Sequence, residues 1–461
     1  MTTRPTKHGW IAIAALVTPV AACRGEIADA RPQWTVVVAT DAPVPQFGDR
    51  LVVELLDDQG TACPGCRRIF DVSHGDRWPL SFGVLPSELG GTPRMRVRLY
   101  RTADAGSDGT PGSVAAIDTL ARLPALGAGI TRVAVELRMD CFGVAADIAA
   151  RTTCDPAGGA ALPEATLNPY AGALDALLRE GSWPRAQPVA CNGAPPANMI
   201  CVPGGAFVLG SPHDFPADVA TFPTPEHVVQ LGAFAIDEDE VTVGQVRALV
   251  KANGLDEPIA HTSDPMSSTF MCSYLTKDDA TNDAMALSCV SFALAERVCA
   301  ALGKRLPTEA EWEFAAGNAQ RESSYPWGED DDICAHAISA VGRTDTMFPE
   351  PTNCRTMGGK TSAPGPVAGG SARDATSLGV RNMGGNMTEW VADVFSPYSS
   401  TCWNSARLLA NPRCTQPSTS VHSIRGSCWS CVPRQARAFE RVRGATDGPS
   451  DQIGFRCAKS M

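Results

Sequence analysis

The sequence is poor in the motifs on which several enzyme classes depend. Its seven histidines are scattered, with neither a His-x-x-x-His pair nor a facial-triad spacing, which argues against a zinc protease or a non-haem iron oxygenase. There is no Gly-x-Ser-x-Gly elbow of the hydrolase type. Basic residues are outnumbered, 39 Lys and Arg against 50 Asp and Glu, and the net charge of −11 argues against nucleic acid as a partner.

Long apolar runs are missing beyond the N-terminus, so membrane contact through a spanning helix is not expected. Residues 1–22 instead read as a signal peptide, with Arg4 and Lys7 before the short apolar stretch Gly9–Val20. The stretch ends in Val20-Ala21-Ala22-Cys23, which resembles a bacterial lipobox. We therefore expect Cys23 to be lipidated.

This N-terminus predicts a protein of the bacterial cell envelope that meets the membrane through a lipid anchor only. Residue 24 is Arg rather than Asp, so nothing signals retention at the inner membrane, and the outer membrane is the expected location. The alternative is an ordinary signal peptide with an incidental Cys23, which predicts a secreted protein.

Cysteine, by contrast, is abundant. Of the 17 cysteines, 16 remain after Cys23 is set aside, an even number that suits disulfides in an oxidising compartment. Several lie close together in sequence: Cys63 and Cys66, Cys141 and Cys154, Cys191 and Cys201, Cys272 and Cys289, Cys334 and Cys354, Cys402 and Cys414. Local disulfides are expected, although spacing does not fix their connectivity.

Residues 23–140 have the pattern of an all-β domain. Apolar residues alternate at Trp34, Val36 and Val38, again from Met95 to Leu99, and again from Val133 to Leu137, with turn-forming residues between the runs. Short strands of this kind predict an antiparallel, immunoglobulin-like sandwich. It carries no cluster of ionisable groups that looks catalytic, so a spacer or adhesion module is expected.

The chain changes character twice more. Residues 141–198 are rich in Cys, Pro and Gly and predict a disulfide-stapled connector with a short helix at Tyr170–Glu180. After Met199, capping residues predict three helices, each beginning after its cap. The caps are Thr242 with Gln245, Ser291, and Thr308 with Glu311.

Four segments of the remaining chain, residues 199–461, occur in the order of a known family. They are Met199-Ile200-Cys201-Val202-Pro203-Gly204-Gly205-Ala206-Phe207, Gly303-Lys304-Arg305-Leu306-Pro307-Thr308-Glu309-Ala310-Glu311-Trp312-Glu313, Gly385-Asn386-Met387-Thr388-Glu389-Trp390 and Ile453-Gly454-Phe455-Arg456-Cys457. Together they resemble the formylglycine-generating enzyme family, also called the sulfatase-modifying-factor domain. The resemblance implies an α/β fold, a C-type-lectin-like variant with little regular secondary structure.

The same resemblance implies a chemistry. Active members of the family oxidise a cysteine of a sulfatase to formylglycine with O2 and a Cu(I) ion held by two thiolates, as a soft ion requires. Matching the stretch before the first catalytic cysteine places that cysteine at Cys431. The second position falls on Ala436, and Cys428 stands where the family has a serine.

Two interpretations of Cys428 and Cys431 remain open. Either Cys428 replaces the missing ligand and both sulfurs hold copper, or the two cysteines form a disulfide with each other or pair separately with Cys402 and Cys414. Strand positions three apart point to opposite faces, so joint action needs a turn or a bulge. We favour the disulfide, hence an exported binding module for a protein or envelope ligand; the alternative is a formylglycine-generating oxidase.

The resemblance also implies a calcium loop. Asn386 and Glu389 would supply side-chain oxygens, and Gly385 and Met387 would supply carbonyl oxygens, the ligands that Ca2+ prefers. The alternative is a tight turn in which Glu389 accepts backbone hydrogen bonds. We expect calcium here.

Two disulfides of the family can also be traced. One implies a Cys299–Cys457 pair, whereas the positions of the other are Ala316 and Arg441, so both of its cysteines are absent together.

Overall fold

The computed structural model describes most of the chain beyond the N-terminal segment. The described residues are 31–63, 65–86, 93–111, 115–157, 161–212, 223–257, 272–337, 373–404, 408–416, 421–431, 433–444 and 450–461, with the backbone of 356–357 and 360–361. The predicted signal peptide, Cys23 and Cys354 lie outside them. Among the described residues, no helix has the length and apolar character needed to cross a membrane.

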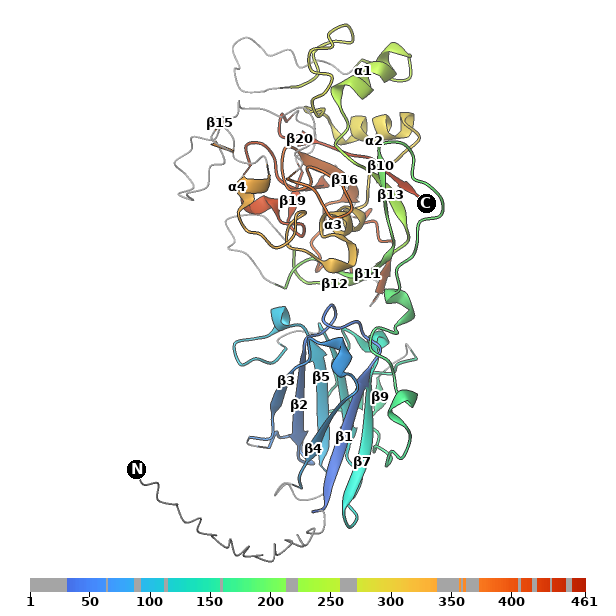
Figure 1. Cartoon of the computed structure of the whole chain (residues 1–461), viewed down its shortest axis with the longest axis vertical. Helices are drawn as coiled ribbons and strands as arrows, with labels where there is room; N and C mark the ends of the chain where they lie inside the picture. Colours follow the sequence, from blue (N-terminus) through green and yellow to red (C-terminus); the bar gives the residue numbers. More distant parts are fainter. Residues whose placement is uncertain are drawn as a thin grey trace, which may run out of the picture.

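The N-terminal part consists of two sheets (Figure 1). The first has the order β4-β1-β7, formed by Leu80–Val84, Gln33–Thr40 and Ile130–Leu137. The second has the order β3-β2-β5-β6, formed by Arg68–Asp71, Arg50–Leu56, Arg94–Tyr100 and Ala116–Arg122. The alternating apolar residues of the sequence, such as Val36, Val97 and Val133, are buried in one cluster shared by both sheets. The immunoglobulin-like class of this part stays a prediction.

The expectation of wholly antiparallel strands is wrong at one place. Strands β1 and β7 pair in parallel, from Gln33 opposite Ile130 to Thr40 opposite Leu137. A parallel pair needs a long crossover connection, and here the chain of the intervening strands supplies it. Alternation shows which face of a strand is buried but says nothing about the direction of its neighbour, so the sequence pattern could not reveal this pairing.

The connector contains no α-helix among its described residues, so the predicted helix at Tyr170–Glu180 is wrong. This segment forms only a 3-10 turn, η4 (Leu174–Ala176), and residues 171–176 are all exposed. Since an isolated short helix is unstable without an apolar face to bury, the segment gains nothing from helix formation. The other connector elements are β8 (Thr152–Thr153), β9 (Leu162–Pro163) and η5 (Pro184–Ala186).

The C-terminal part is mostly β with few helices. Its three larger sheets have the orders β10-β13-β21 (Met199–Val202, Phe234–Asp237, Ala458–Ser460), β11-β12-β17 (Gly205–Leu209, His227–Leu231, Leu408–Ala410) and β19-β18-β16-β20 (Arg441–Arg443, His422–Arg425, Thr388–Val394, Ile453–Gly454). A small hairpin joins β14 (Thr356–Met357) to β15 (Lys360–Thr361). The first strand of this part, β10, and the last, β21, pair with opposite edges of β13. The beginning and the end of the C-terminal part therefore belong to the same sheet.

The three predicted helices form where their caps begin them. They are α1 (Val243–Lys251), α2 (Phe292–Ala301) and α3 (Glu309–Ala316), and both capping boxes make their reciprocal hydrogen bonds. A fourth, α4 (Ile333–His336), was not predicted because a single turn has no apolar periodicity to read. The remaining 3-10 turns are η1 (Gly75–Arg77), η2 (Thr102–Asp104), η3 (Met139–Cys141), η6 (Ala319–Arg321) and η7 (Pro433–Ala436).

Every cysteine among the described residues is part of a disulfide. The local pairs Cys63–Cys66, Cys141–Cys154, Cys191–Cys201, Cys272–Cys289 and Cys402–Cys414 form as expected. Cys299–Cys457, implied by the family resemblance, is confirmed and ties α2 to the segment before β21. The predicted partner of Cys334, Cys354, lies outside the described residues.

Arg441, one of the two positions at which the resemblance implies a second family disulfide, forms a buried ion pair. The guanidinium of Arg441 on β19 donates to both carboxylate oxygens of Glu309 on α3, at 2.7 and 2.9 Å, and lies 3.8 Å from the ring centre of Tyr398. All three residues are fully buried, and so is Ala316. Charge and ring stacking therefore join α3 to β19, although removing either partner of such a pair would leave a costly unpaired charge.

The N-terminal and C-terminal parts of the chain contact each other through specific polar and apolar side chains. Arg101, which follows β5, contacts Glu226, Glu322 and Asp104, with 3.3 Å to Glu322 and 3.2 Å to Asp104. Gln46 donates to the carbonyl of Ala206 at 2.9 Å and to Glu322 at 3.0 Å. Ala206, Val208 and Val228 of the C-terminal part also belong to the apolar cluster of the N-terminal sheets. The N-terminal part is therefore packed against its neighbour rather than tethered to it.

The interface has more carboxyl groups than counter-charges. One guanidinium, that of Arg101, faces three carboxyl groups in a largely buried setting. Burial raises the pKa of Glu226 from 4.5 to about 8 and also raises the pKa of Glu322. Since the folded pKa of Glu226 lies above its unfolded value, its contribution to stability is present below pH 4.5 and is lost as the pH rises through about 8.

We predict that Arg101→Met lowers the free energy of unfolding by about 3–5 kcal/mol, because it leaves buried carboxyl groups without their partner. Urea unfolding followed by tryptophan fluorescence measures the loss. Arg77→Met, at an exposed position on η1, is the control and should change stability by less than about 0.5 kcal/mol. Equal effects of the two variants would contradict the interface described above.

We also predict that Glu226→Gln makes the free energy of unfolding less dependent on pH. The wild-type free energy of unfolding should fall between pH 4.5 and about 8, and the variant should lose less over this range. Unfolding curves at several pH values measure both slopes; identical slopes would show that Glu226 titrates in the folded protein as it does in the unfolded chain.

Candidate functional site

The loop after β18 carries the candidate cysteines. The chain turns at Gly426, whose φ is +78° and whose hypothetical Cβ would lie 2.7 Å from the carbonyl oxygen of Met383, so only glycine fits. Cys428 and Cys431 then occupy the two ends of a turn, in which the N–H of Cys431 donates to the carbonyl of Cys428 at 3.0 Å. Their Cα atoms are 4.8 Å apart and their sulfurs form a disulfide.

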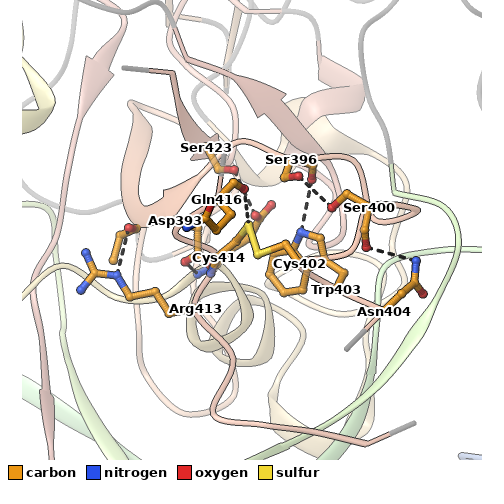
Figure 2. The surroundings of a disulfide bond; sticks show 12 residues. Asp393, Ser396, Ser400, Cys402, Trp403, Asn404, Arg413, Cys414, Gln416 and Ser423 are labelled. Atoms are coloured by element: carbon orange, nitrogen blue, oxygen red, sulfur yellow. Dashed lines mark hydrogen bonds between the residues drawn. A yellow bond between two sulfur atoms is a disulfide. The ribbon is translucent and has the colours of Figure 1, made fainter. Parts of the chain in front are cut away.

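The turn distinguishes between the disulfide pairings that the sequence left open. Cys428 and Cys431 bridge each other. Cys402 and Cys414 form a separate bridge, which Figure 2 shows. On a strand, the side chains of Cys428 and Cys431 would point to opposite faces. The turn after Gly426 places both sulfurs on the same side.

Trp429 fixes this turn to the segment that was predicted to bind calcium. Its side chain is only 8% exposed and packs with Met387 and Ala286. Its backbone N–H donates to the carbonyl of Asn386 at 2.9 Å, and its indole N–H donates to the carbonyl of Asp451 at 2.9 Å. The turn is therefore held from both sides without the help of the sulfurs.

The two sulfurs have different surroundings. Cys428 is fully buried, whereas Cys431 is partly exposed. The hydroxyl of Ser430 lies 3.6 Å from the sulfur of Cys428 and accepts a hydrogen bond of 2.8 Å from the Gln452 amide. The hydroxyl of Thr388 lies 3.8 Å from the sulfur of Cys431.

The residues present do not fit a copper ion in this state. Cu(I) needs thiolates, and the sulfurs of Cys428 and Cys431 are bonded to each other. Ala436, on which the resemblance places the family's second copper position, is 1% exposed in η7 and offers only a methyl group.

Two of the predicted calcium ligands accept hydrogen bonds from the protein itself. Both carboxylate oxygens of Glu389, a fully buried residue, accept hydrogen bonds from the Arg456 guanidinium, and one also accepts from the Trp312 indole at 2.7 Å. The carbonyl of Gly385 accepts from the N–H of Met387 at 2.9 Å. The side-chain N–H of Asn386 donates to Glu240 at 2.9 Å. The calcium loop stays a prediction.

Two further buried acids lie near this segment, and sequence reasoning missed them. Glu240 accepts from the amides of Asn382 and Asn386, both at 2.9 Å, and Asp374 accepts from the N–H of Gly384 at 3.1 Å. Burial raises the pKa of Glu240 to about 8 and that of Asp374 to about 7. Among the described residues, no group of three or more His, Cys, Asp or Glu side chains is arranged to hold a metal ion.

A cleft of about 630 Å³ lies elsewhere on the C-terminal part. Its walls include Arg305, which forms a two-pronged pair with Glu311 at 2.6 and 2.7 Å, and Arg413, which lies 3.5 Å from Glu296. This volume falls in the usual range for small-molecule sites. The cleft does not include the cysteine turn.

We predict that calcium does not stabilise the protein, because Glu389 is already neutralised by Arg456. The measurement is the melting temperature with excess CaCl2 and with a chelator, which should agree. A calcium site filled at a hundredfold excess over its Kd would add about 2.7 kcal/mol to the free energy of unfolding. A dose-dependent rise in melting temperature that chelation reverses would contradict this and bear out the calcium loop expected from the sequence.

Comparison with known proteins agrees with the motif resemblance. Residues 186–461 match the sulfatase-modifying factor enzyme 1-like domain, a match that begins somewhat before the boundary expected at residue 199. The chain is 25% identical over 310 residues to the formylglycine-generating enzyme of Bos taurus, covering 60% of this chain and 77% of the enzyme. It is 24% identical over 295 residues to the inactive C-alpha-formylglycine-generating enzyme 2 of Mus musculus, covering 57% and 85%.

Other matches are shorter or more distant. The serine/threonine-protein kinase Pkn1 of Chlamydia trachomatis is 29% identical over 160 residues, which span 35% of this chain and only 22% of the kinase. Among solved structures, PvdO from Pseudomonas aeruginosa aligns with a TM-score of 0.41 and 22% identity, over 57% of this chain and 94% of PvdO. The family match covers more than half of the sequence, and the chain belongs to the formylglycine-generating enzyme (sulfatase-modifying factor) family.

Proposed function

We propose that this protein is a divergent member of the family that binds a ligand or a partner protein and does not oxidise cysteine with copper. The observation that carries the proposal is the altered centre: Cys431 is bridged to Cys428, and Ala436 replaces the second thiol. Copper ligation requires deprotonated thiols, and the resting bridge offers none.

One observation favours the alternative, a copper-dependent oxidase that converts a cysteine of a substrate protein to formylglycine. The turn holds the Cα atoms of Cys428 and Cys431 4.8 Å apart, so a reduced pair would present two thiols on the same side. Against this, the partner sulfur would come from a position that is a serine in the family. The mouse relative, whose name calls it inactive, supports the idea that this domain type also occurs without the oxidase activity.

The cellular setting is part of the proposal. The segment 1–22 and Cys23 suggest an exported, lipid-anchored protein of the bacterial envelope. The many disulfides support an oxidising compartment. In this setting the N-terminal sheets, which we interpret as an immunoglobulin-like module, hold the C-terminal domain away from the membrane in a fixed orientation.

We predict that the reduced protein, loaded with Cu(I) and exposed to O2, leaves a cysteine-containing peptide unchanged. Mass spectrometry of the peptide detects the loss of its thiol and the gain of an aldehyde. The matched variant is Ala436→Cys with Cys428→Ser, which restores the family spacing and should bind Cu(I) more tightly than the wild type. Formation of the aldehyde by the wild-type protein, abolished in Cys431→Ser, would refute the proposal and establish the oxidase.

A further inference from the structure

We propose that the Cys428–Cys431 bridge is a redox-active disulfide that exchanges with the thiols of a partner protein, with Cys431 as the sulfur that is attacked. This inference rests on the proposed function in one respect, that the domain binds a partner protein. It assigns that partner a chemical class, a protein that presents a pair of thiols.

The first observation is the asymmetry of exposure within the bridge. Cys431 is partly exposed, and Cys428 is fully buried. Because Cys431 is the more exposed residue of the two, the proposal takes its sulfur as the one that an incoming thiolate attacks and the sulfur of Cys428 as the one that departs. The bridge between Cys299 and Cys457 differs, since both of its cysteines are fully buried and neither sulfur is open to attack.

The second observation is a hydrogen-bond donor aimed at the departing sulfur. A disulfide sulfur carries no hydrogen, so in the 3.6 Å contact between Ser430 and Cys428 the hydroxyl is the donor. The amide of Gln452 donates to the same hydroxyl oxygen at 2.8 Å and fixes its position. A donor at this place stabilises a thiolate as it forms and makes Cys428 a better leaving group.

The neighbouring bridge shows the opposite arrangement. At Cys402–Cys414, the sulfur of Cys414 lies 3.1 Å from the carbonyl oxygen of Gln416, as Figure 2 shows. A carbonyl cannot donate a hydrogen bond, so it would repel a thiolate formed on that sulfur. In exposure the two bridges are alike, since Cys402 is partly exposed and Cys414 is only 1% exposed. They differ in the group that faces the buried sulfur, which is a carbonyl at Cys414 and a hydroxyl at Cys428.

The third observation is that the fold depends little on the Cys428–Cys431 bond. Its cysteines are 3 residues apart, and in the chain-entropy model a short loop contributes least to stability. The turn is held by Trp429, through bonds to Asn386 and Asp451, and these do not involve sulfur. Opening the bridge therefore leaves two thiols close together, ready to close again.

The exchange balances without a metal or oxygen. A partner thiolate attacks the sulfur of Cys431, a new sulfur–sulfur bond forms, and the electron pair of the broken bond leaves on Cys428. The second partner thiolate attacks the partner sulfur of this mixed disulfide and releases Cys431, whose sulfur is 3.8 Å from the Thr388 hydroxyl. The partner loses two electrons and becomes a disulfide, and the protein gains them as a dithiol, whose protons come from the partner thiols.

The test uses the full chain with its disulfides formed and a synthetic peptide that carries two cysteines. The protein carries Cys63→Ser and Cys66→Ser, which removes the other bridge of the same spacing. After quenching with an alkylating reagent, mass spectrometry should find new thiols at Cys428 and Cys431 and a disulfide in the peptide. If Cys402–Cys414 opens while Cys428–Cys431 stays closed, the proposal is wrong.

Two cysteine variants separate the roles of the sulfurs. Cys428→Ser, treated with oxidised glutathione, should hold a stable mixed disulfide at Cys431, because the resolving sulfur is gone. Cys431→Ser should lose the exchange altogether. Near-ultraviolet circular dichroism checks that both variants are folded. Equal exchange in wild type and Cys431→Ser would overturn the assignment of the attacked sulfur.

Ser430 is a positioning residue in this scheme, and its variant should change the pH profile. Ser430→Ala should slow exchange by roughly tenfold, the size of one hydrogen bond to a charged group. It should also raise the pH at which the Cys428 thiol closes a mixed disulfide held at Cys431, and Ser430→Thr should restore both properties. An unchanged rate and pH profile in Ser430→Ala would refute the role of the hydroxyl. Failure of exchange would leave the proposed binding function standing, since that function is tested with copper and O2.

Discussion

The ion pair between Arg456 and Glu389 is the interaction on which the rest of the site depends. Both side chains are fully buried, so neither charge is stabilised by water. The guanidinium also donates to the carbonyls of Asp237, Glu238 and Arg381. One side chain thus joins β13 and the 381–389 segment to the C-terminal end of the chain. The backbone N–H of Trp429 donates to Asn386 in the same segment. The Arg456–Glu389 ion pair therefore helps to position the turn that carries the two cysteines.

A second charge network holds the opposite side of the domain. Glu309 and Glu313 project from α3 toward Arg425 and Arg441, and Glu309 is fully buried like both arginines. Arg441 is also one of the two positions at which the resemblance implies a further family disulfide, and here it forms a buried ion pair with Glu309.

The sequence predicted what depends on local patterns and on motifs. Capping residues located three helices, alternation located the strands around Val36, Val97 and Val133, and close spacing paired most of the local cysteines. The helix at Tyr170–Glu180 failed because local preference is insufficient without a face to bury. The parallel pairing of β1 with β7 was invisible because alternation carries no direction.

The site was harder to predict than the fold, since its chemistry depends on contacts between distant residues. The sequence singled out Glu389 as a calcium ligand but gave no sign of its partner Arg456, which lies 67 positions further on. Glu240 has no motif at all and is recognisable only from its burial beside Asn386. The disulfide between Cys428 and Cys431 depends on the turn after Gly426. The spacing of the two cysteines alone could not distinguish this turn from a strand.

Disulfide mapping of the native protein, digested under acidic conditions that prevent exchange, tests the central claim most directly. The account predicts one peptide in which Cys428 is bonded to Cys431 and another in which Cys402 is bonded to Cys414. Free thiols at Cys428 and Cys431 in the protein as isolated, or bonds from them to Cys402 and Cys414, would contradict the account.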